Sequence, residues 1–385
     1  MRTKTQEGFL SILRYEICGT ELPQSFAVSD EEALIRLSEK QDLTHLVYDA
    51  LTRSGVGCGS QKAMSQYYAA LWRVEQMDYE LGRISELFET HGIDFMPLKG
   101  AVMRGMYPQR WMRTSADIDI LLRAEQEEEA EALLAEKLGY LQDTEHQGVH
   151  HASFFSPENH VHIEPHRMLF HEIHSDKYTD HFRSVWDRAL QDPAGRGHRY
   201  MLSDAERYAF HIAHMEKHLH LGGGCSVRGL IDLWFLDRMP DADKEGRKRL
   251  LEECSLTLFE SRMRGLIDAW MDGCPAENEQ LEQYVLEGYL YGTTERKAEL
   301  DIKKQGRLGY FIRRAFMPYK TMKTQYPVLE KHPYLLPVMW PVRWARRMAD
   351  KAGRARMKTQ LKTSLTADEG TIGEIRELSE YLGIE

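Results

Sequence analysis

The stretch Ile93–Leu122 reads IDFMPLKGAVMRGMYPQRWMRTSADIDILL, and it decides the fold that we expect for this chain. Phe95 to Leu98 predict a short apolar strand, Lys99-Gly100 a tight turn, and the residues after it a helix and a loop. A second strand then carries Asp117 and Asp119 among apolar neighbours. Side chains two positions apart on a strand point to the same face, so both carboxylates should project together. The residues expected to face the core are Ile118, Ile120 and Leu122.

Two neighbouring carboxylates repel each other, so such a pair is stable when a cation lies between them. A divalent metal that carries a polyphosphate would meet this need, which makes Asp117 and Asp119 candidate metal ligands. The other interpretation is an exposed face of an edge strand that happens to hold two aspartates, because the D-x-D pattern is short.

Residues on both sides of this pair favour phosphate binding. Gly100 follows the first strand and opens the predicted helix, where backbone N–H groups and the helix dipole favour an anion. Arg113, Thr114 and Ser115 precede the acidic strand and can donate hydrogen bonds to phosphate oxygens.

A third carboxylate lies on the segment His160–His166, which alternates apolar and polar residues like a half-buried strand. We expect this segment to form a hairpin with Val149 to Phe155. Its polar side should carry His162, Glu164 and His166. On a neighbouring strand, Glu164 can help to hold metal ions or accept the proton of an attacking hydroxyl.

These residues together carry a family resemblance. They are Leu98-Lys99-Gly100, Arg113, the run from Asp117 to Leu122, and Glu164-Pro165-His166. In this arrangement the chain resembles the uncharacterised nucleotidyltransferase family, which belongs to the DNA polymerase β-like nucleotidyltransferase superfamily, over roughly residues 30 to 345. The resemblance implies a small mixed sheet flanked by helices, Mg²⁺ dependence, and transfer of a nucleoside monophosphate to an acceptor hydroxyl.

The resemblance also implies roles for single residues. Asp117 and Asp119 would be the metal ligands, with two Mg²⁺ ions, and Glu164 would be the third acid. The superfamily turn has Gly-Ser or Gly-Gly, whereas this chain has Gly100-Ala101, so we expect Lys99 to supply a point charge to the triphosphate. His166 should orient Glu164 or contact phosphate.

Length and composition are those of a globular protein. The 385 residues are 42% hydrophobic and 29% charged, enough for two or three domains with a sizeable core. No apolar run reaches the ~18 to 20 residues of a membrane span, and the charged N-terminus does not resemble a signal peptide. Five scattered cysteines without a C-x-x-C pair favour a reducing, cytoplasmic location.

Residues 1–92 should form a helical N-terminal region that ends in a long helix from about Gln61 to His91. We expect the aromatic residues of that helix to be core rather than a base-stacking platform. They are Tyr67, Tyr68 and Trp72. A catalytic domain should follow over residues 93–190 and a helical C-terminal domain over residues 191–385.

Eight of the 17 histidines lie between His146 and His174, so a histidine-ligated metal hydrolase is a competing hypothesis. The chain has no H-E-x-x-H spacing, and the aspartate pair favours a hard ion with oxygen ligands instead. Three of these histidines are expected to be polar surface: His150, His151 and His171.

The part from Leu202 onward should be helical and begins with a capping box from Ser203 to Glu206. His211, His214 and His218 would then share one helix face, either as a packing stripe or facing the cleft.

A further helix follows Ser226, and on it Arg228 and Asp232 lie four residues apart and can pair. A histidine helix followed by R-x-x-x-D also resembles the C-terminal part of the family. We expect Arg228 and Asp232 to border the nucleotide or the acceptor, with an ordinary salt bridge between helices as the alternative.

Between Arg296 and Lys362 the chain has 18 Lys and Arg against four Asp and Glu, whereas its overall net charge is −10. Residues 296–362 could contact an anionic membrane surface or RNA phosphates. They could equally complement the acidic remainder of the chain or form a solvated face. Asp368–Glu385 should be a short terminal helix.

The sequence therefore predicts an α+β protein, with a small mixed nucleotidyltransferase sheet between mostly helical N- and C-terminal regions. The predicted function is Mg²⁺-dependent transfer of a nucleoside monophosphate from an NTP. The acceptor could be a small molecule, a protein or an RNA. The alternatives are a nucleotide-binding regulatory module without turnover and a histidine-ligated metal hydrolase.

Overall fold

The computed structural model describes most of the chain. The described residues are 1–23, 26, 28–143, 153–170, 177–222, 224–288, 296, 302, 306, 309, 310, 312–349, 353, 354, 358 and 369–384. Contacts divide the chain into two compact units. The first consists of Met1–Met215 and Ser226–Leu290, and the second of Glu216–Cys225 and Tyr291–Glu385.

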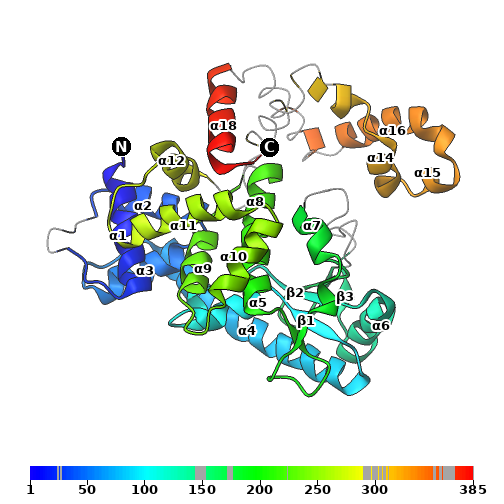
Figure 1. Cartoon of the computed structure of the whole chain (residues 1–385), viewed down its shortest axis with the longest axis horizontal. Helices are drawn as coiled ribbons and strands as arrows, with labels where there is room; N and C mark the ends of the chain where they lie inside the picture. Colours follow the sequence, from blue (N-terminus) through cyan, green and yellow to red (C-terminus); the bar gives the residue numbers. More distant parts are fainter. Residues whose placement is uncertain are drawn as a thin grey trace. The chain divides into compact units, whose positions relative to one another are not determined.

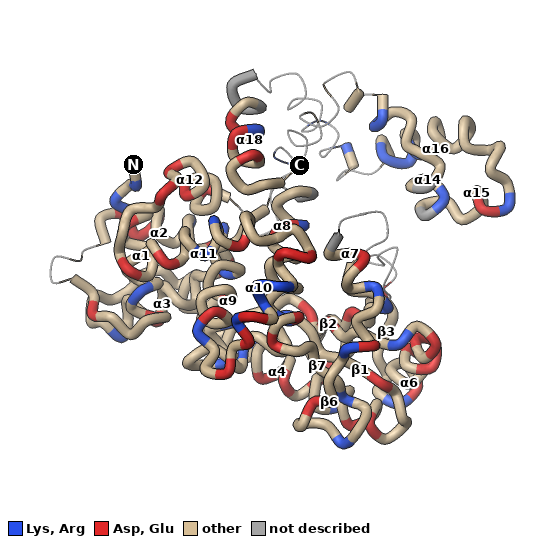
Figure 2. Tube along the Cα trace, viewed as in Figure 1, with Lys and Arg blue, Asp and Glu red and all other residues tan. Residues whose placement is uncertain are grey.

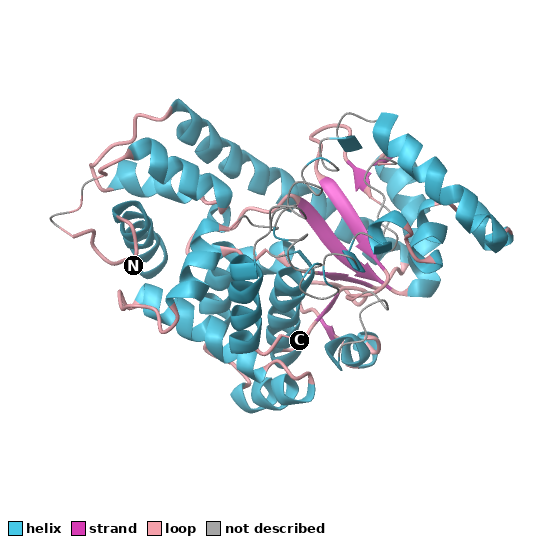
Figure 3. Ribbon diagram, turned by 90° about the horizontal axis from the view of Figure 1, so that it is seen from above, coloured by secondary structure: helices cyan, strands magenta, loops and turns pink. Residues whose placement is uncertain are grey.

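A mixed five-stranded sheet with the order β1-β2-β5-β4-β3 positions the acidic residues in the first unit. Its strands are β1 (Phe95–Pro97), β2 (Asp117–Leu122), β3 (Leu141–Gln142), β4 (Phe154–Phe155) and β5 (His162–His166). β2 and β5 pair in parallel, whereas the other neighbouring strands are antiparallel. Figure 3 shows the strands as magenta arrows among the helices. A two-stranded hairpin is formed by β6 (Leu190–Gln191) and β7 (Tyr200–Met201).

The core of the sheet lies on one face, under helices α4 (Gln61–His91) and α6 (Glu127–Leu138). The alternation of β2 produces this arrangement, because its aspartates point away from its apolar residues. As predicted, the apolar residues of β2 are buried in the core cluster: Ile118, Ile120 and Leu122. The hairpin prediction is confirmed for Phe154 and Phe155, which pair with β5, whereas residues 149–152 lie outside the described residues.

Local capping signals fix the ends of the helices around the sheet. The Ser60 hydroxyl accepts a hydrogen bond from the N–H of Ala63 at the start of α4, and Gly92 ends that helix with a left-handed φ of 73°. Figure 1 shows α4 in blue to cyan beside the sheet. The N-terminal region is helical as predicted, and its other helices are α1 (Lys4–Cys18), α2 (Glu31–Lys40) and α3 (Thr44–Arg53).

The aromatic residues of α4 depart from the prediction. Tyr68 and Trp72 are not core, because 58% and 67% of their surfaces are exposed. Tyr67 is half-buried and packs edge-on against Trp111. The helical periodicity of the sequence does not show which flank of an aromatic-rich helix is covered, and here the neighbouring elements leave this flank open.

The helix predicted after Gly100 is short. α5 (Gly100–Met103) is a single turn, and the 3-10 helices η1 (Arg104–Met106) and η2 (Arg110–Met112) continue the path to β2. Two further 3-10 helices of the first unit are η3 (Ala124–Gln126) and η4 (Val185–Asp187).

The first unit is completed by helices that follow the sheet, as predicted. They are α7 (Lys177–Phe182), α8 (Asp204–Gly222, which continues into the second unit), α9 (Val227–Asp237), α10 (Lys244–Glu253), α11 (Thr257–Met271) and α12 (Glu279–Glu287). The predicted serine cap is present, since the Ser203 hydroxyl accepts from the N–H of Glu206 at 3.2 Å. The side chain of Glu206 instead bonds to Arg188.

The described part of the second unit is helical. Its elements are α14 (Tyr319–Gln325), α15 (Val328–Lys331), η5 (Pro333–Leu335), α16 (Leu336–Ala349) and α18 (Glu369–Leu382). α18 corresponds to the predicted terminal helix. Figure 2 shows basic residues in blue around α14 and α16. Among the described residues, no helix combines the length and the apolar character needed to cross a membrane.

Candidate active site

The parallel pairing of β2 and β5 brings the predicted acids together. Its register places Asp119 opposite Glu164 and Asp117 opposite His162. The acids come from segments more than forty residues apart in sequence, and the ladder of hydrogen bonds between the strands fixes their spacing.

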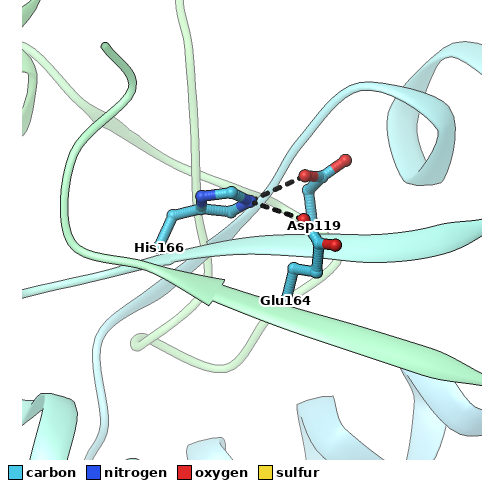
Figure 4. Close-up of side chains that lie close together, drawn as sticks. All are labelled: Asp119, Glu164 and His166. Atoms are coloured by element: carbon cyan, nitrogen blue, oxygen red, sulfur yellow. Dashed lines mark hydrogen bonds and ion pairs between the residues drawn. The ribbon is translucent and has the colours of Figure 1, made fainter. Parts of the chain in front are cut away.

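Asp119 is the centre of the cluster, with 3% of its surface exposed. Its Oδ1 accepts a hydrogen bond from the Lys99 ammonium at 2.7 Å and lies 2.7 Å from Nε2 of His166. The same His166 nitrogen lies 3.7 Å from Oε2 of Glu164. Figure 4 shows the imidazole of His166 directed at both carboxylates.

The charged groups of this cluster shift one another's pKa values. Burial alone would raise the pKa of Asp119, but Lys99 and His166 outweigh it and hold this pKa below its usual range. Burial likewise opposes the charge on Lys99, yet Asp119, Asp117 and Glu164 raise the Lys99 pKa.

For Asp117 and Glu164, the nearby positive charges do not offset the effects of burial and of the neighbouring carboxylates. Burial, followed by the charges of Asp119 and Glu164, raises the pKa of Asp117 to about 6. Burial and Asp119 also raise the pKa of Glu164. A cation that approached these carboxylates would lower both pKa values, because it would offset the repulsion among them.

The side chains fit a metal ion. One ligand atom each of Asp119, Glu164 and His166 can be chosen so that all lie within 4.8 Å of one another. Two carboxylates and one imidazole are donors for a divalent ion such as Mg²⁺, Mn²⁺ or Zn²⁺. Asp117 is not a member of this group, although it projects from the same face of β2.

The turn between β1 and α5 is held in an unusual conformation. Lys99 has a φ of 46°, which a residue with a Cβ rarely adopts. Gly100 follows it in close contact with Ser115: a Cβ added to Gly100 would lie 2.7 Å from the Ser115 hydroxyl. The turn therefore requires glycine at position 100, and it brings the Lys99 ammonium onto Asp119.

Arg113, which was predicted to donate to phosphate oxygens, is paired with a buried carboxylate in this structure. Its Nε and Nη2 donate to the two oxygens of Asp232 at 2.8 Å each. Asp232 also accepts from the hydroxyl of Tyr107 at 2.6 Å. Although burial would raise the pKa of Asp232, Arg113 keeps it lowered, so the pair is ionised.

The predicted pairing of Arg228 with Asp232 is wrong. Arg228 donates to Asp42 at 2.7 Å and to the carbonyl of Thr114 at 3.3 Å, because Asp232 is taken by Arg113. The structure thus brings Arg113, Arg228 and Asp232 together around the loop that enters β2, with Arg228 and Asp232 bonded to different partners.

Ser115 lies at the end of the same loop. Its hydroxyl accepts from Nη2 of Arg104 at 3.0 Å, and Arg104, which is fully buried, also donates to Asp78 at 2.7 Å. Ser115 therefore fixes the turn against the loop, through its contact with Gly100.

Arg73 on α4 is a residue that sequence reasoning missed. Its guanidinium donates to the carbonyl of Ala116 at 2.8 Å and to that of His160 at 3.2 Å. These carbonyls precede β2 and β5, so Arg73 joins the two strands at the end where Asp117 lies. A single arginine on a long amphipathic helix carries no sequence signal for this contact.

The histidines have separate roles. His211 is half-buried and bonds to the carbonyl of Gly229 at 2.8 Å, so this histidine packs against α9. His166 lies in the acidic cluster, whereas His150, His151 and His171 lie outside the described residues.

A cavity of about 380 Å³ lies between α4, the turn after β1 and the β6–β7 hairpin. Its arginines are neutralised by carboxylates: Arg110 by Asp78, Arg199 by Asp192, and Arg207 by Asp204. The three predicted catalytic acids do not line this cavity, so it is separate from the candidate site.

The chain matches a known protein family. A family model described as "Uncharacterised nucleotidyltransferase" matches residues 28–272, more than half of the chain. The matched range includes the turn at Lys99, both acidic strands and α9. No curated protein matches the chain.

Proposed function

The chain belongs to the uncharacterised nucleotidyltransferase family, and on this basis we propose that it transfers a nucleoside monophosphate from an NTP to an acceptor hydroxyl and releases pyrophosphate. The observation that carries the proposal is the in-register placement of Asp119 and Glu164 on parallel strands, with Asp117 on the same face as Asp119. Burial and the neighbouring carboxylates raise the pKa values of Asp117 and Glu164, which supports a cation-dependent reaction.

Each side chain has a role that its contacts support. Asp117, Asp119 and Glu164 would hold two Mg²⁺ ions, and His166 is close enough to be a further ligand. Bound Mg²⁺ would neutralise the triphosphate and lower the pKa of the attacking hydroxyl. Lys99 keeps Asp119 ionised and offers the ammonium nearest to the acids for a phosphate oxygen.

The reaction forms a bond between the acceptor oxygen and the α-phosphorus and breaks the bond from that phosphorus to the bridging oxygen. The proton of the acceptor hydroxyl passes to the Glu164 carboxylate, which faces the same cluster as Asp119. The Gly100 N–H and the Ser115 hydroxyl at the turn are donors for the phosphates.

Arg113, Arg228 and Asp232 act as positioning residues in this proposal. They hold the loop before β2 between α9 and the segment that carries Asp42. They would therefore set the position of Asp117, which follows this loop. The unpaired state of the five cysteines supports a cytoplasmic location.

The proposal is tested by thermal unfolding with each NTP, with and without Mg²⁺. A ligand at 100 times its Kd stabilises the folded state by about 2.7 kcal/mol, which is visible as a Tm shift. We expect one NTP, such as ATP, to give a Mg²⁺-dependent shift that Asp117→Ala and Asp119→Asn lose. The matched control Asp241→Ala removes an exposed aspartate elsewhere in the first unit and should keep the shift.

Turnover is tested separately with NTP labelled at the α-phosphate and a cell extract as the source of acceptor. Transfer of label with release of pyrophosphate supports the transferase. A Tm shift without transfer would assign the chain to nucleotide binding without turnover, and the absence of any NTP-dependent shift would overturn both functions.

One observation favours a second candidate, a histidine-ligated metal hydrolase. His166 is one of the three side chains close enough to share an ion. Metal analysis of the purified protein distinguishes the two functions, because tightly held zinc or iron is expected of the hydrolase and weakly held Mg²⁺ of the transferase.

A further inference from the structure

Helix α16 in the second unit turns a continuous apolar face to solvent. The side chains on this face recur at helical spacing, and every one of them is exposed: Pro337, Val338, Pro341, Val342, Ala345, Met348 and Ala349. Val338 and Val342 are 59% and 44% exposed. A helix in a globular protein normally presents such a face to the core, so this orientation is inverted.

Three hydrogen bonds fix the orientation. The indole N–H groups of Trp340 and Trp344 donate to the carbonyls of Met317 and Ala315 at 2.9 and 3.2 Å. Arg343, with only 1% of its surface exposed, donates to the carbonyl of Arg314 at 3.1 Å. These three polar side chains of α16 thus bond on its inner side, and its apolar side chains remain outside.

The surroundings of this face are strongly basic. Residues 312–349 contain eight Lys and Arg and a single acid, Glu330, a net charge of +7. Arg346 is exposed at the edge of the face, and Tyr334, just before the helix, is 72% exposed. An amphipathic helix with an apolar face, a basic edge and a nearby aromatic residue is suited to the interface of an anionic lipid bilayer.

We propose that the apolar face of α16 docks on an anionic membrane surface. The basic residues around it bind lipid head groups, while Val338 and Val342 enter the acyl boundary. This occupant fits better than a second copy of the chain, because two surfaces of like charge would repel each other. It also fits better than RNA, whose phosphates and bases would require an exposed face that is cationic or aromatic rather than aliphatic.

The test is flotation of the full-length protein with vesicles of phosphatidylcholine, alone or with about one third phosphatidylglycerol. We expect binding to the anionic vesicles only, and weaker binding as the salt concentration rises. The double variant Val338→Asp/Val342→Asp should reduce partitioning by about tenfold or more. Val56→Asp, at a loop valine with the same 44% exposure as Val342, is the matched control and should bind normally.

Circular dichroism and the NTP-dependent Tm shift serve as checks on folding. If the double variant folds poorly, Arg346→Gln leaves the apolar face intact and should still weaken binding to anionic vesicles several-fold. No binding by the native chain, equal binding to neutral vesicles, or unchanged binding by the double variant would each overturn the proposal. If the native chain does not bind vesicles but forms a dimer that the double variant dissociates, the occupant is a second copy of the chain. If it instead binds an RNA probe and the double variant does not, the occupant is RNA.

Discussion

At the scale of single residues, the site depends on one ammonium held against one buried carboxylate. The turn that delivers Lys99 to Asp119 has no hydroxyl of its own, since Ala101 follows Gly100. Ser115 instead brings a hydroxyl against Gly100 from the loop before β2. The turn and that loop are therefore in direct contact, and a change in the conformation of either should move the other.

Gly100→Ala tests this coupling. The added Cβ would lie 2.7 Å from the Ser115 hydroxyl, so the turn or the loop must shift. We expect a loss of about 1–3 kcal/mol in the free energy of unfolding, measured in urea, and loss of the NTP-dependent Tm shift. Gly105→Ala is the control, because its Cβ would meet nothing within 4 Å. Ser115→Gly removes the obstacle, so Gly100→Ala should cost less stability in the Ser115→Gly background than in the native chain. An equal cost in both backgrounds would refute the steric explanation.

At the scale of elements, the parallel contact of β2 with β5 sets the distance between the acids. Parallel strands are joined by a long connection, so local turn geometry does not fix their register. Arg73 supplies a direct link, because its guanidinium bonds to carbonyls that precede both strands. α4 therefore packs against one face of the sheet and also bonds to the end that carries Asp117.

Arg73→Gln should loosen this end of the sheet. The variant loses two charge-assisted hydrogen bonds, and we expect a loss of about 1–3 kcal/mol in the free energy of unfolding and a smaller NTP-dependent Tm shift. Arg36→Gln removes an arginine from an exposed ion pair with Glu32 and should change either quantity little. A full NTP-dependent shift in Arg73→Gln would show that the arginine contributes to stability alone.

The packing of α1 against α3 predicts a pH dependence away from the site. Burial raises the pKa of Glu16 from 4.5 to about 7, with Asp49 adding to the rise and Arg53 opposing it. The folded state therefore binds a proton that the unfolded state releases between these pH values. The stability from the protonated form is complete below about pH 4.5 and is lost as the pH rises through 7.

Glu16→Gln should remove this dependence, because the amide stays neutral. The free energy of unfolding of the native chain should fall relative to the variant by roughly 3 kcal/mol at most between pH 4.5 and 8. Urea unfolding across this range measures the difference. A constant difference between the two proteins would contradict a raised pKa for Glu16.

At the scale of the whole molecule, the sequence predicted what local periodicity controls. Apolar residues that recur at every second position predicted the alternation of β2 and the position of the third acid on β5. Apolar residues that recur every three to four positions predicted the helices of the α+β arrangement. The partner of Arg113 did not follow, because Asp232 lies 119 positions away and competes with nearer candidates. Exposure of Trp72 and of the α16 face depends on which flank of a helix its neighbours cover, and helical periodicity alone does not contain that information.

The two proposed functions lie in different compact units, and this separation is itself testable by hydrogen exchange. Mg²⁺ with the NTP that shifts the Tm should slow amide exchange in β2 and β5, where ligand binding reduces local opening, and leave α16 unchanged. Anionic vesicles should protect α16 and leave β2 and β5 unchanged. Mass spectrometry of peptides from 117–122, 162–166 and 336–349 measures both responses. Protection of β2 by vesicles without nucleotide would show that membrane contact affects the first unit, and the two proposed functions would then have to be treated as one coupled system.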